Sequence, residues 1–262
     1  MKLDRISLGI PGTTSHDAIR ILAPRIESAG FHALWLNDTA AVSGGDGDSL
    51  AGLAAAAEVT TTLVLATGVI ALDRRPPTEI AAAAAHLPQR RLVLGIGSGS
   101  SPKSVTRVSD GITRLRELTT VPIYLGALGP KMRHLAATQA DGLLFNWLKP
   151  EAAGEGMRDL QRDASGRTVR GVLYARTALT REGMPELVAE ARRYATYPAY
   201  AANFARTGTD PLETTIDGSS PGALSGRAAE YLAHVDELVL RAITGATSVD
   251  SYLDFIDRVT EA

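Results

Sequence analysis

The stretch LVLATGV, residues 63–69, is followed by an alanine-rich segment at residues 77–85 and then by a second apolar run, LVLG, at residues 92–95. Neither run alternates polar with apolar residues, so both predict strands that are buried on two faces. The segment between them begins at Pro77, and proline is favoured in the first turn of a helix. A buried strand, a helix and another buried strand in succession predict parallel pairing.

The same unit repeats along the chain. Eight apolar runs, each followed by a segment with helical spacing, lie at Ile6–Gly9, Ala33–Leu36, Leu63–Val69, Leu92–Gly95, Pro122–Leu125, Gly142–Phe145, Val169–Tyr174 and Leu238–Arg241. Eight such units in 262 residues fit the (β/α)8 or TIM barrel, an α/β fold that usually needs about 250 residues. We therefore predict one barrel domain over residues 1–262. In such barrels the functional residues lie in the loops that follow the strands.

Helices are expected between these strands. The patterns predict them at residues 16–29, from Asp48 or Ser49 onward, from Pro77, and at 105–118, 131–139, 150–163, 185–194, 200–205, 226–235 and 249–260. The stretch Gly208–Gly222 has no periodicity, and we expect it to be a long mobile loop of the kind that covers sites.

Composition excludes several classes of function. Apolar residues make up 45% of the chain and charged residues 21%, which is typical of a soluble globular protein. A formal net charge of −2 gives no reason to expect nucleic acid or an anionic membrane as a partner. The absence of cysteine excludes disulfides, thiolate catalysis and cysteine-bound metals. Since residues 1–7, MKLDRIS, are unlike a signal peptide and no apolar run could span a bilayer, we expect a cytoplasmic protein that acts on a small molecule.

The loop GIGSGS, residues 95–100, follows a predicted strand but does not match a dinucleotide-binding fingerprint, because Ser100 stands where a third glycine is needed. Its glycines still allow the backbone to approach a cofactor closely. The five histidines lack the spacing and the strand-end positions of metal ligands, so no metal site is expected.

The segment GALGPKM, residues 126–132, has the features of an anion site. It follows the fifth strand, and Gly129 and Pro130 open a helix whose free N–H groups face the end of the barrel where sites lie. Phosphate groups bind readily at such helix starts. Lys131 and Arg133 add positive charge nearby, so the sequence predicts a phosphate site here.

Polar residues end three other strands. Asn37, Asp38 and Thr39 follow the second strand, Asn146 and Trp147 follow the sixth, and Arg241 ends the eighth. Side chains at these positions of a barrel usually face the site. An arginine buried there needs an anionic partner, which could be Asp38 or a ligand.

Together these segments resemble a known family. WLND at 35–38, ATGVI at 66–70, LVLGIG at 92–97, YLGALGPKM at 124–132 and ADGLL at 140–144 are similar to the bacterial luciferase-like superfamily of oxidoreductases. They look most like its branch that uses the deazaflavin coenzyme F-420, including the methylene-tetrahydromethanopterin reductases. The similarity covers nearly the whole chain.

The resemblance implies a TIM barrel with the coenzyme in its mouth. It implies a cis peptide between Gly68 and Val69 that forms a bulge behind the tricyclic ring. Asp38 matches an acidic residue near the ring and is our candidate catalytic group. The other matches are Ser98 and Gly99, which would lie along the coenzyme, and Leu128, Gly129, Lys131 and Met132, which would bind its phosphate.

Two departures limit the transfer. The F-420-dependent sugar-phosphate dehydrogenases carry a histidine where Thr39 stands and a glutamate where Ser100 stands, so their substrate and proton-transfer chemistry are not expected here. The segment after the fourth strand is also shorter than in most relatives, which would leave the ring more open on that side.

Three functions fit these observations. The first is an F-420-dependent oxidoreductase that moves a hydride to or from an organic substrate, with Thr39, Asn146, Trp147 and Arg241 on the substrate side. The second is an FMN-dependent monooxygenase, because FMN activates oxygen and deazaflavin does not readily do so. The third is a flavin-binding or cofactor-free barrel without activity. The adjacent alanine-rich helices at 49–57 and 77–87 suggest a homodimer that would pack through them.

Overall fold

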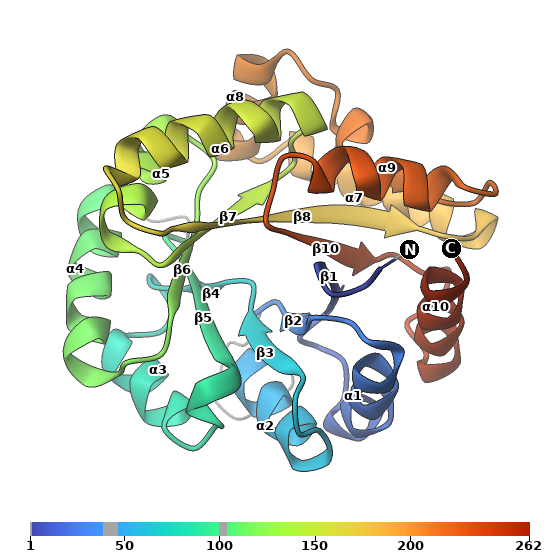
Figure 1. The fold of residues 1–262 in the computed structure, drawn as a ribbon, viewed down its shortest axis with the longest axis horizontal. Coiled ribbons are helices and arrows are strands. Elements are labelled where there is room, and N and C mark those ends of the chain that lie inside the picture. Colours follow the sequence, from blue (N-terminus) through green and yellow to red (C-terminus); the bar gives the residue numbers. More distant parts are fainter. Residues whose placement is uncertain (1, 39–46, 100–103) are drawn as a thin grey trace.

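Eight parallel strands close into a barrel in the computed structural model, which describes residues 2–38, 47–99 and 104–262 (Figure 1). They are β1 (Ile6–Ile10), β2 (Ala33–Leu36), β3 (Val64–Thr67), β5 (Leu92–Gly97), β6 (Ile123–Gly126), β7 (Gly142–Asn146), β8 (Arg170–Ala178) and β10 (Glu237–Ala242). The barrel closes because β10 pairs with both β1 and β8. Each strand overlaps one of the eight predicted runs, and the predicted TIM barrel is confirmed.

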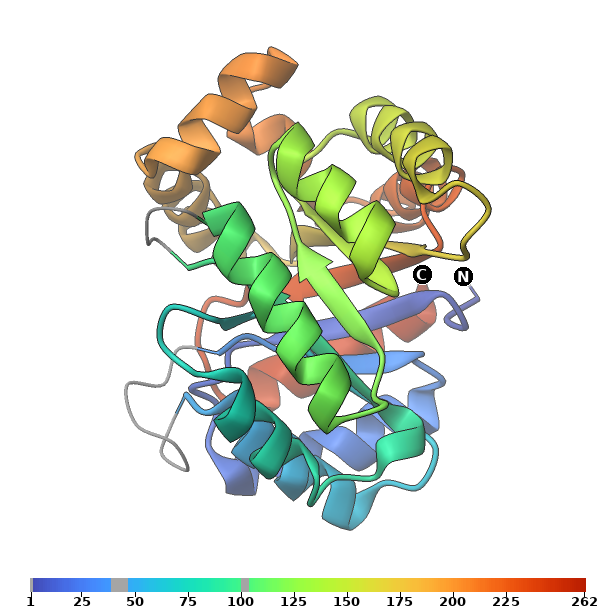
Figure 2. The same ribbon diagram turned by 90° about the vertical axis from the view of Figure 1, so that its left-hand side faces the viewer.

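Helices cover the outside of the barrel (Figure 1). They are α1 (His16–Ala29), α2 (Ser49–Val59), α3 (Pro77–Ala84), α4 (Ser104–Leu118), α5 (Pro130–Gln139), α6 (Pro150–Ala164), α7 (Met184–Ala195), α8 (Pro198–Thr207), α9 (Ala223–Leu232) and α10 (Val249–Glu261). Figure 2 shows α4 and α5 on either side of β6. None of the described helices is long and apolar enough to cross a membrane.

Local sequence signals set several helix ends. The Ser15 hydroxyl accepts a hydrogen bond from the Ala18 N–H and begins α1, and Gly30 ends it with a φ of 87°, a conformation that glycine adopts without strain. The Asp48 carboxylate caps α2 in the same way. Helices α3, α5 and α6 each begin at a proline.

The expectation of a mobile loop at Gly208–Gly222 was wrong. Residues Pro211–Thr214 form a 3-10 helix, η3, and Ile216–Asp217 form a short strand, β9, that pairs with β8. Asp210 and Glu213 form a capping box at the start of η3, which satisfies the free backbone N–H groups there. This capping signal is local and does not need hydrophobic periodicity.

The barrel has two apolar layers. Outward-facing strand residues pack against the helices, and a smaller inner cluster fills the lumen; its members are Ala33, Trp35, Ala66, Tyr124, Leu144, Val172, Tyr174 and Val239. Glu237 closes the N-terminal end of the lumen, where its Oε1 accepts hydrogen bonds from Trp35 Nε1 at 2.8 Å and the Ser7 hydroxyl at 2.7 Å. These bonds satisfy polar groups that would be costly to bury alone.

Candidate active site

The C-terminal ends of the strands meet at one end of the barrel, which we call the mouth. We call two side chains at this end its floor: Tyr174, a member of the inner cluster, and Val69, which packs against that cluster. Such an end is where barrel enzymes build their sites.

Tyr174 crosses the lumen from β8 to the opposite strands. A Cβ placed on Gly9 or on Gly68 would lie 3.0 Å from the Tyr174 hydroxyl oxygen. Glycine at both positions therefore leaves room for the tyrosine. The ring stands edge-to-face on Trp35, with centroids 6.0 Å apart. Burial raises the pKa of the Tyr174 hydroxyl well above its usual value, and no described group accepts its hydrogen.

Val69 forms the other half of the floor. A Cβ on Gly97 would lie 2.8 Å from Val69 Cγ2, and one on Gly126 would lie 3.2 Å from Val69 Cγ1. The peptide between Gly68 and Val69 is cis, as predicted. The chain bends at this point, so the predicted strand at 63–69 ends at Thr67 and resumes against β5 as β4 (Ile70–Ala71).

Helix α5 begins at the rim of the mouth. Gly129 precedes it and, having no side chain, gives the first N–H groups of the helix no capping hydrogen bond. Lys131 is exposed at this start, and Met132 packs on the core. The Leu128 carbonyl accepts a hydrogen bond of 2.9 Å from Arg206 of α8, which ties that helix to the turn.

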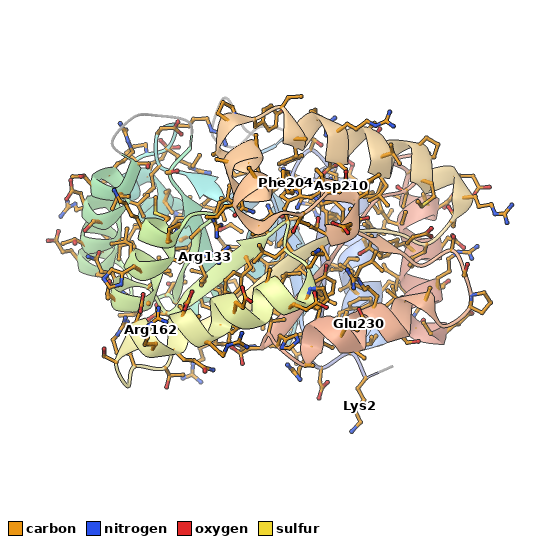
Figure 3. The ribbon with its side chains drawn as sticks, turned by 90° about the horizontal axis from the view of Figure 1, so that it is seen from above. Lys2, Arg133, Arg162, Phe204, Asp210 and Glu230 are labelled. Atoms are coloured by element: carbon orange, nitrogen blue, oxygen red, sulfur yellow. The ribbon has the colours of Figure 1, made fainter. Side chains whose placement is uncertain are left out.

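Arg133, predicted to add positive charge at this helix start, packs on an aromatic ring, and its contribution to an anion site stays a prediction. Its guanidinium lies over the Phe145 ring, 5.4 Å from the centroid, in the layer between the strands and α6. Burial, together with the neighbouring charge of Arg206, lowers the pKa of Arg133 to about 10. Figure 3 labels Arg133 on α5 and Phe204 on α8.

Asp38 lies at the mouth but is engaged by its neighbours. It is 7% exposed, and Oδ2 accepts hydrogen bonds from the Ser49 hydroxyl at 2.9 Å and the Ser49 N–H at 3.3 Å. Arg75 approaches Asp38 Oδ2 at 3.5 Å and also bonds the Asp48 carboxylate at 2.8 Å. This network joins the end of β2 to the start of α2, and a catalytic role for Asp38 stays a prediction.

Asp38, one of the two partners considered for Arg241, forms its ion pair with Arg75 instead. Arg241 faces inward at the end of β10 and donates to the Ala242 carbonyl, and it forms no ion pair within the described part of the chain. On the opposite side, the Ser98 hydroxyl bonds the Gly99 carbonyl at 3.1 Å. Thr39 and Ser100 lie outside the described residues.

Asn146 and Trp147 join a cluster that the sequence did not predict. Arg176 of β8 donates to the Asn146 side-chain oxygen, and its guanidinium stacks on the Trp147 ring at 4.2 Å and on the Tyr194 ring at 4.7 Å. Trp147, predicted to lie on the substrate side, is 1% exposed, so it lines no open surface. Its backbone has a positive φ of 54°. The predicted strand ended at Tyr174, two residues before Arg176. Had it been extended, Arg176 would have been placed on the same face as Tyr174, because alternate residues of a strand face the same side.

Sequence and structure comparisons agree with this architecture. The family described as luciferase-like monooxygenase matches residues 4–120 and 106–251. The chain belongs to this family. It is an oxidoreductase of the luciferase-like class, which depends on a flavin or on deazaflavin. No curated protein sequence matches it.

Of three similar solved structures, two depend on F-420 and one is in complex with FMN. The coenzyme F-420 dependent tetrahydromethanopterin reductase from Methanopyrus kandleri has a TM-score of 0.76 and 16% identity, over 98% of this chain and 97% of that chain. An F-420-dependent secondary alcohol dehydrogenase in complex with an F-420–acetone adduct has a TM-score of 0.74 and 15% identity, over 99% and 98%. The oxygenating constituent of 3,6-diketocamphane monooxygenase from Pseudomonas putida, in complex with FMN, has a TM-score of 0.70 and 12% identity, over 97% and 96%.

Proposed function

We propose that this protein transfers a hydride between coenzyme F-420 and an organic substrate. The observation that carries the proposal is the floor of the mouth, where Val69 and Tyr174 each occupy space that two glycines leave free. A tricyclic ring needs a broad apolar surface beneath it. Larger residues at those glycines would displace Val69 and Tyr174, which supply that surface. Two solved relatives with similar folds use this coenzyme.

The rim supplies the second requirement, a place for the phosphate of the coenzyme. The start of α5 offers backbone N–H groups with no side-chain cap, and Lys131 adds an exposed positive charge. Arg206 is held against the Leu128 carbonyl and brings a further cation to the turn. The residues present therefore fit a phosphate-bearing ring coenzyme.

When bound, the deazaflavin supplies the hydride chemistry, as cofactors do in such enzymes. The residues of the chain bind and orient it. Gly129 and Lys131 would hold the phosphate, Val69 would support the ring, and Ser98 and Gly99 would lie along its side. Asn146 and Arg241 would face the substrate.

An FMN-dependent monooxygenase is the alternative, and one observation favours it: a monooxygenase component that binds FMN matches this fold over nearly its full length. The two proposals differ in the coenzyme bound rather than in the place where it binds.

Titration of the purified protein with F-420 and, separately, with FMN distinguishes them. We expect quenching of coenzyme fluorescence to saturate at a lower concentration with F-420. Tighter binding of FMN would favour the monooxygenase. Binding of neither coenzyme would contradict both proposals and leave the inactive barrel.

A further inference from the structure

A depression lies on the N-terminal face of the barrel, at the end opposite the mouth. It has a volume of about 480 Å³ and is formed by the start of β8, the second half of α6 and the residues that precede β1 and β10. Three arginines line it, namely Arg5, Arg167 and Arg170. Because β10 pairs with both β1 and β8, these arginines come from the starts of neighbouring strands. We call this depression the basal pocket.

Two of the arginines are held in place by backbone carbonyls. Arg5 donates to three carbonyls between the end of α9 and the start of β10. Arg167 donates to the Ala137 and Ala140 carbonyls at the end of α5, at 2.7 and 3.0 Å. A carbonyl carries only a partial charge, so each guanidinium keeps most of its positive charge. Neither arginine forms an ion pair with a carboxylate of the described residues.

Arg170 is bound more loosely than the other two. Its Nη2 lies 3.6 Å from Glu237 Oε2, and its side chain is 41% exposed. The same carboxylate is approached by His32 at 3.7 Å, and its Oε1 accepts the hydrogen bond from Trp35 Nε1. Arg170 can therefore contact a ligand in the pocket, and its contact with Glu237 links the pocket to the base of the lumen.

The remaining lining residues suit an organic anion. The one acidic residue among them is Asp236, and its Oδ2 already accepts a hydrogen bond of 2.8 Å from the Gly171 N–H. Apolar walls come from Met157, Ala164 and Val169, all buried. Three guanidiniums against one carboxylate leave an excess of positive charge, and guanidinium donors match the oxygens of phosphate and carboxylate groups.

We propose that the basal pocket binds a small organic anion that carries phosphate or carboxylate groups. Arg5 and Arg167 would supply fixed positive charge, and Arg170 would turn from Glu237 toward the ligand. The apolar walls would contact the body of the molecule. Because this pocket lies at the end of the barrel opposite the mouth, its ligand would be a molecule other than the coenzyme or the substrate. The inference does not depend on the proposed function.

Calorimetric titration of the full-length protein at low ionic strength tests the pocket, with pyrophosphate and citrate as separate probes. Gln161→Glu adds a negative charge to the pocket and leaves its arginines in place. Gln161 is exposed, and glutamate favours helices as glutamine does, so this variant should fold. Ala82→Glu, at an exposed position of α3, is the control for added charge. Arg170→Gln removes one cation, and Lys131→Glu separates this pocket from the phosphate site at α5.

We expect the wild type to bind at least one probe with a dissociation constant below about 1 mM. Gln161→Glu and Arg170→Gln should each weaken binding about tenfold, as the loss of one charge-assisted contact does. Ala82→Glu and Lys131→Glu should bind as the wild type does. The probe that binds more tightly identifies phosphate or carboxylate as the preferred group.

Trp35 provides a spectroscopic readout, because its indole N–H donates to the carboxylate that Arg170 approaches. The chain has two tryptophans, so the indole signals in a nitrogen-15 NMR spectrum can be assigned with Trp147→Phe. We expect the Trp35 signal to shift as the probe saturates the wild type. In Arg170→Gln the shift should be lost.

Failure of the wild type to bind either probe would overturn the proposal, and so would an unchanged affinity in folded Gln161→Glu. Binding that Lys131→Glu abolishes and Gln161→Glu retains would assign the anion to α5 and likewise overturn it. A Trp35 signal that does not move at saturation would overturn the role given to Arg170. Binding in the basal pocket of a protein that binds neither F-420 nor FMN would instead contradict the proposed function alone.

Discussion

Glu27 joins the end of α1 to the start of β3, the strand that precedes the Gly68–Val69 peptide. Its Oε1 accepts hydrogen bonds from the N–H groups of Thr61, Thr62 and Leu63 at 2.9, 2.6 and 2.8 Å, and from the Thr62 hydroxyl at 2.8 Å. Burial raises the pKa of this carboxyl, but the four donors outweigh burial and lower the pKa to about 2. The ionised form is therefore the one that the folded state prefers.

Replacing Glu27 by glutamine removes this charge and keeps the shape. A pKa lowered from 4.5 to about 2 corresponds to at most ~3 kcal/mol of folding free energy. Because the side chain is partly exposed and solvent screens it, we expect Glu27→Gln to lower the free energy of unfolding at pH 7 by about 1–2 kcal/mol.

The pH dependence tests the cause. A group whose pKa is depressed on folding contributes fully above its unfolded pKa, and the contribution is lost as pH falls from 4.5 toward about 2. Urea unfolding followed by circular dichroism should thus show a difference between wild type and Glu27→Gln that shrinks by about half from pH 7 to pH 3. Glu58→Gln, at an exposed pair with Arg20 on the neighbouring helix, is the control and should change stability little. A difference that is the same at both pH values would refute the argument.

Three further changes test other parts of the account. Lys131→Glu should weaken FMN or F-420 binding at least about tenfold, as expected for a charge-assisted contact, whereas Lys2→Glu should not; equal affinities in a titration would remove the phosphate assignment. Gly97→Ala should displace Val69, because the new Cβ would lie 2.8 Å from Val69 Cγ2. The displaced floor should then weaken the binding of lumiflavin, a flavin ring without phosphate. Gly226→Ala on α9, where nothing lies within 4 Å, should instead raise the free energy of unfolding by about 0.5–1 kcal/mol; equal effects of the two changes on lumiflavin would argue against a packed floor. Glu237→Leu leaves Trp35 Nε1 and the Ser7 hydroxyl without acceptors and should cost about 3 kcal/mol in urea unfolding, so a loss below about 1 kcal/mol would contradict the role of that network.

The strands were predictable because burial on both faces leaves an uninterrupted apolar run, as at Ala33–Leu36, where the predicted and observed bounds agree. Site residues could be predicted only where they end a strand or begin a helix. Arg176 was missed because β8 extends to Ala178, past the apolar run that ends at Tyr174. Its partners are Glu190, the Asn146 side-chain oxygen and two aromatic rings, all from other segments, and such tertiary partners leave no local pattern. The same holds for Arg75, the unexpected partner of Asp38.

A crystal structure of the protein with oxidised F-420 tests the central claim most directly. The account predicts density for the tricyclic ring over Val69 and Tyr174 and for the phosphate at the N–H groups that begin α5, beside Lys131. A coenzyme bound elsewhere, or a ring in the mouth with its phosphate away from α5, would contradict it.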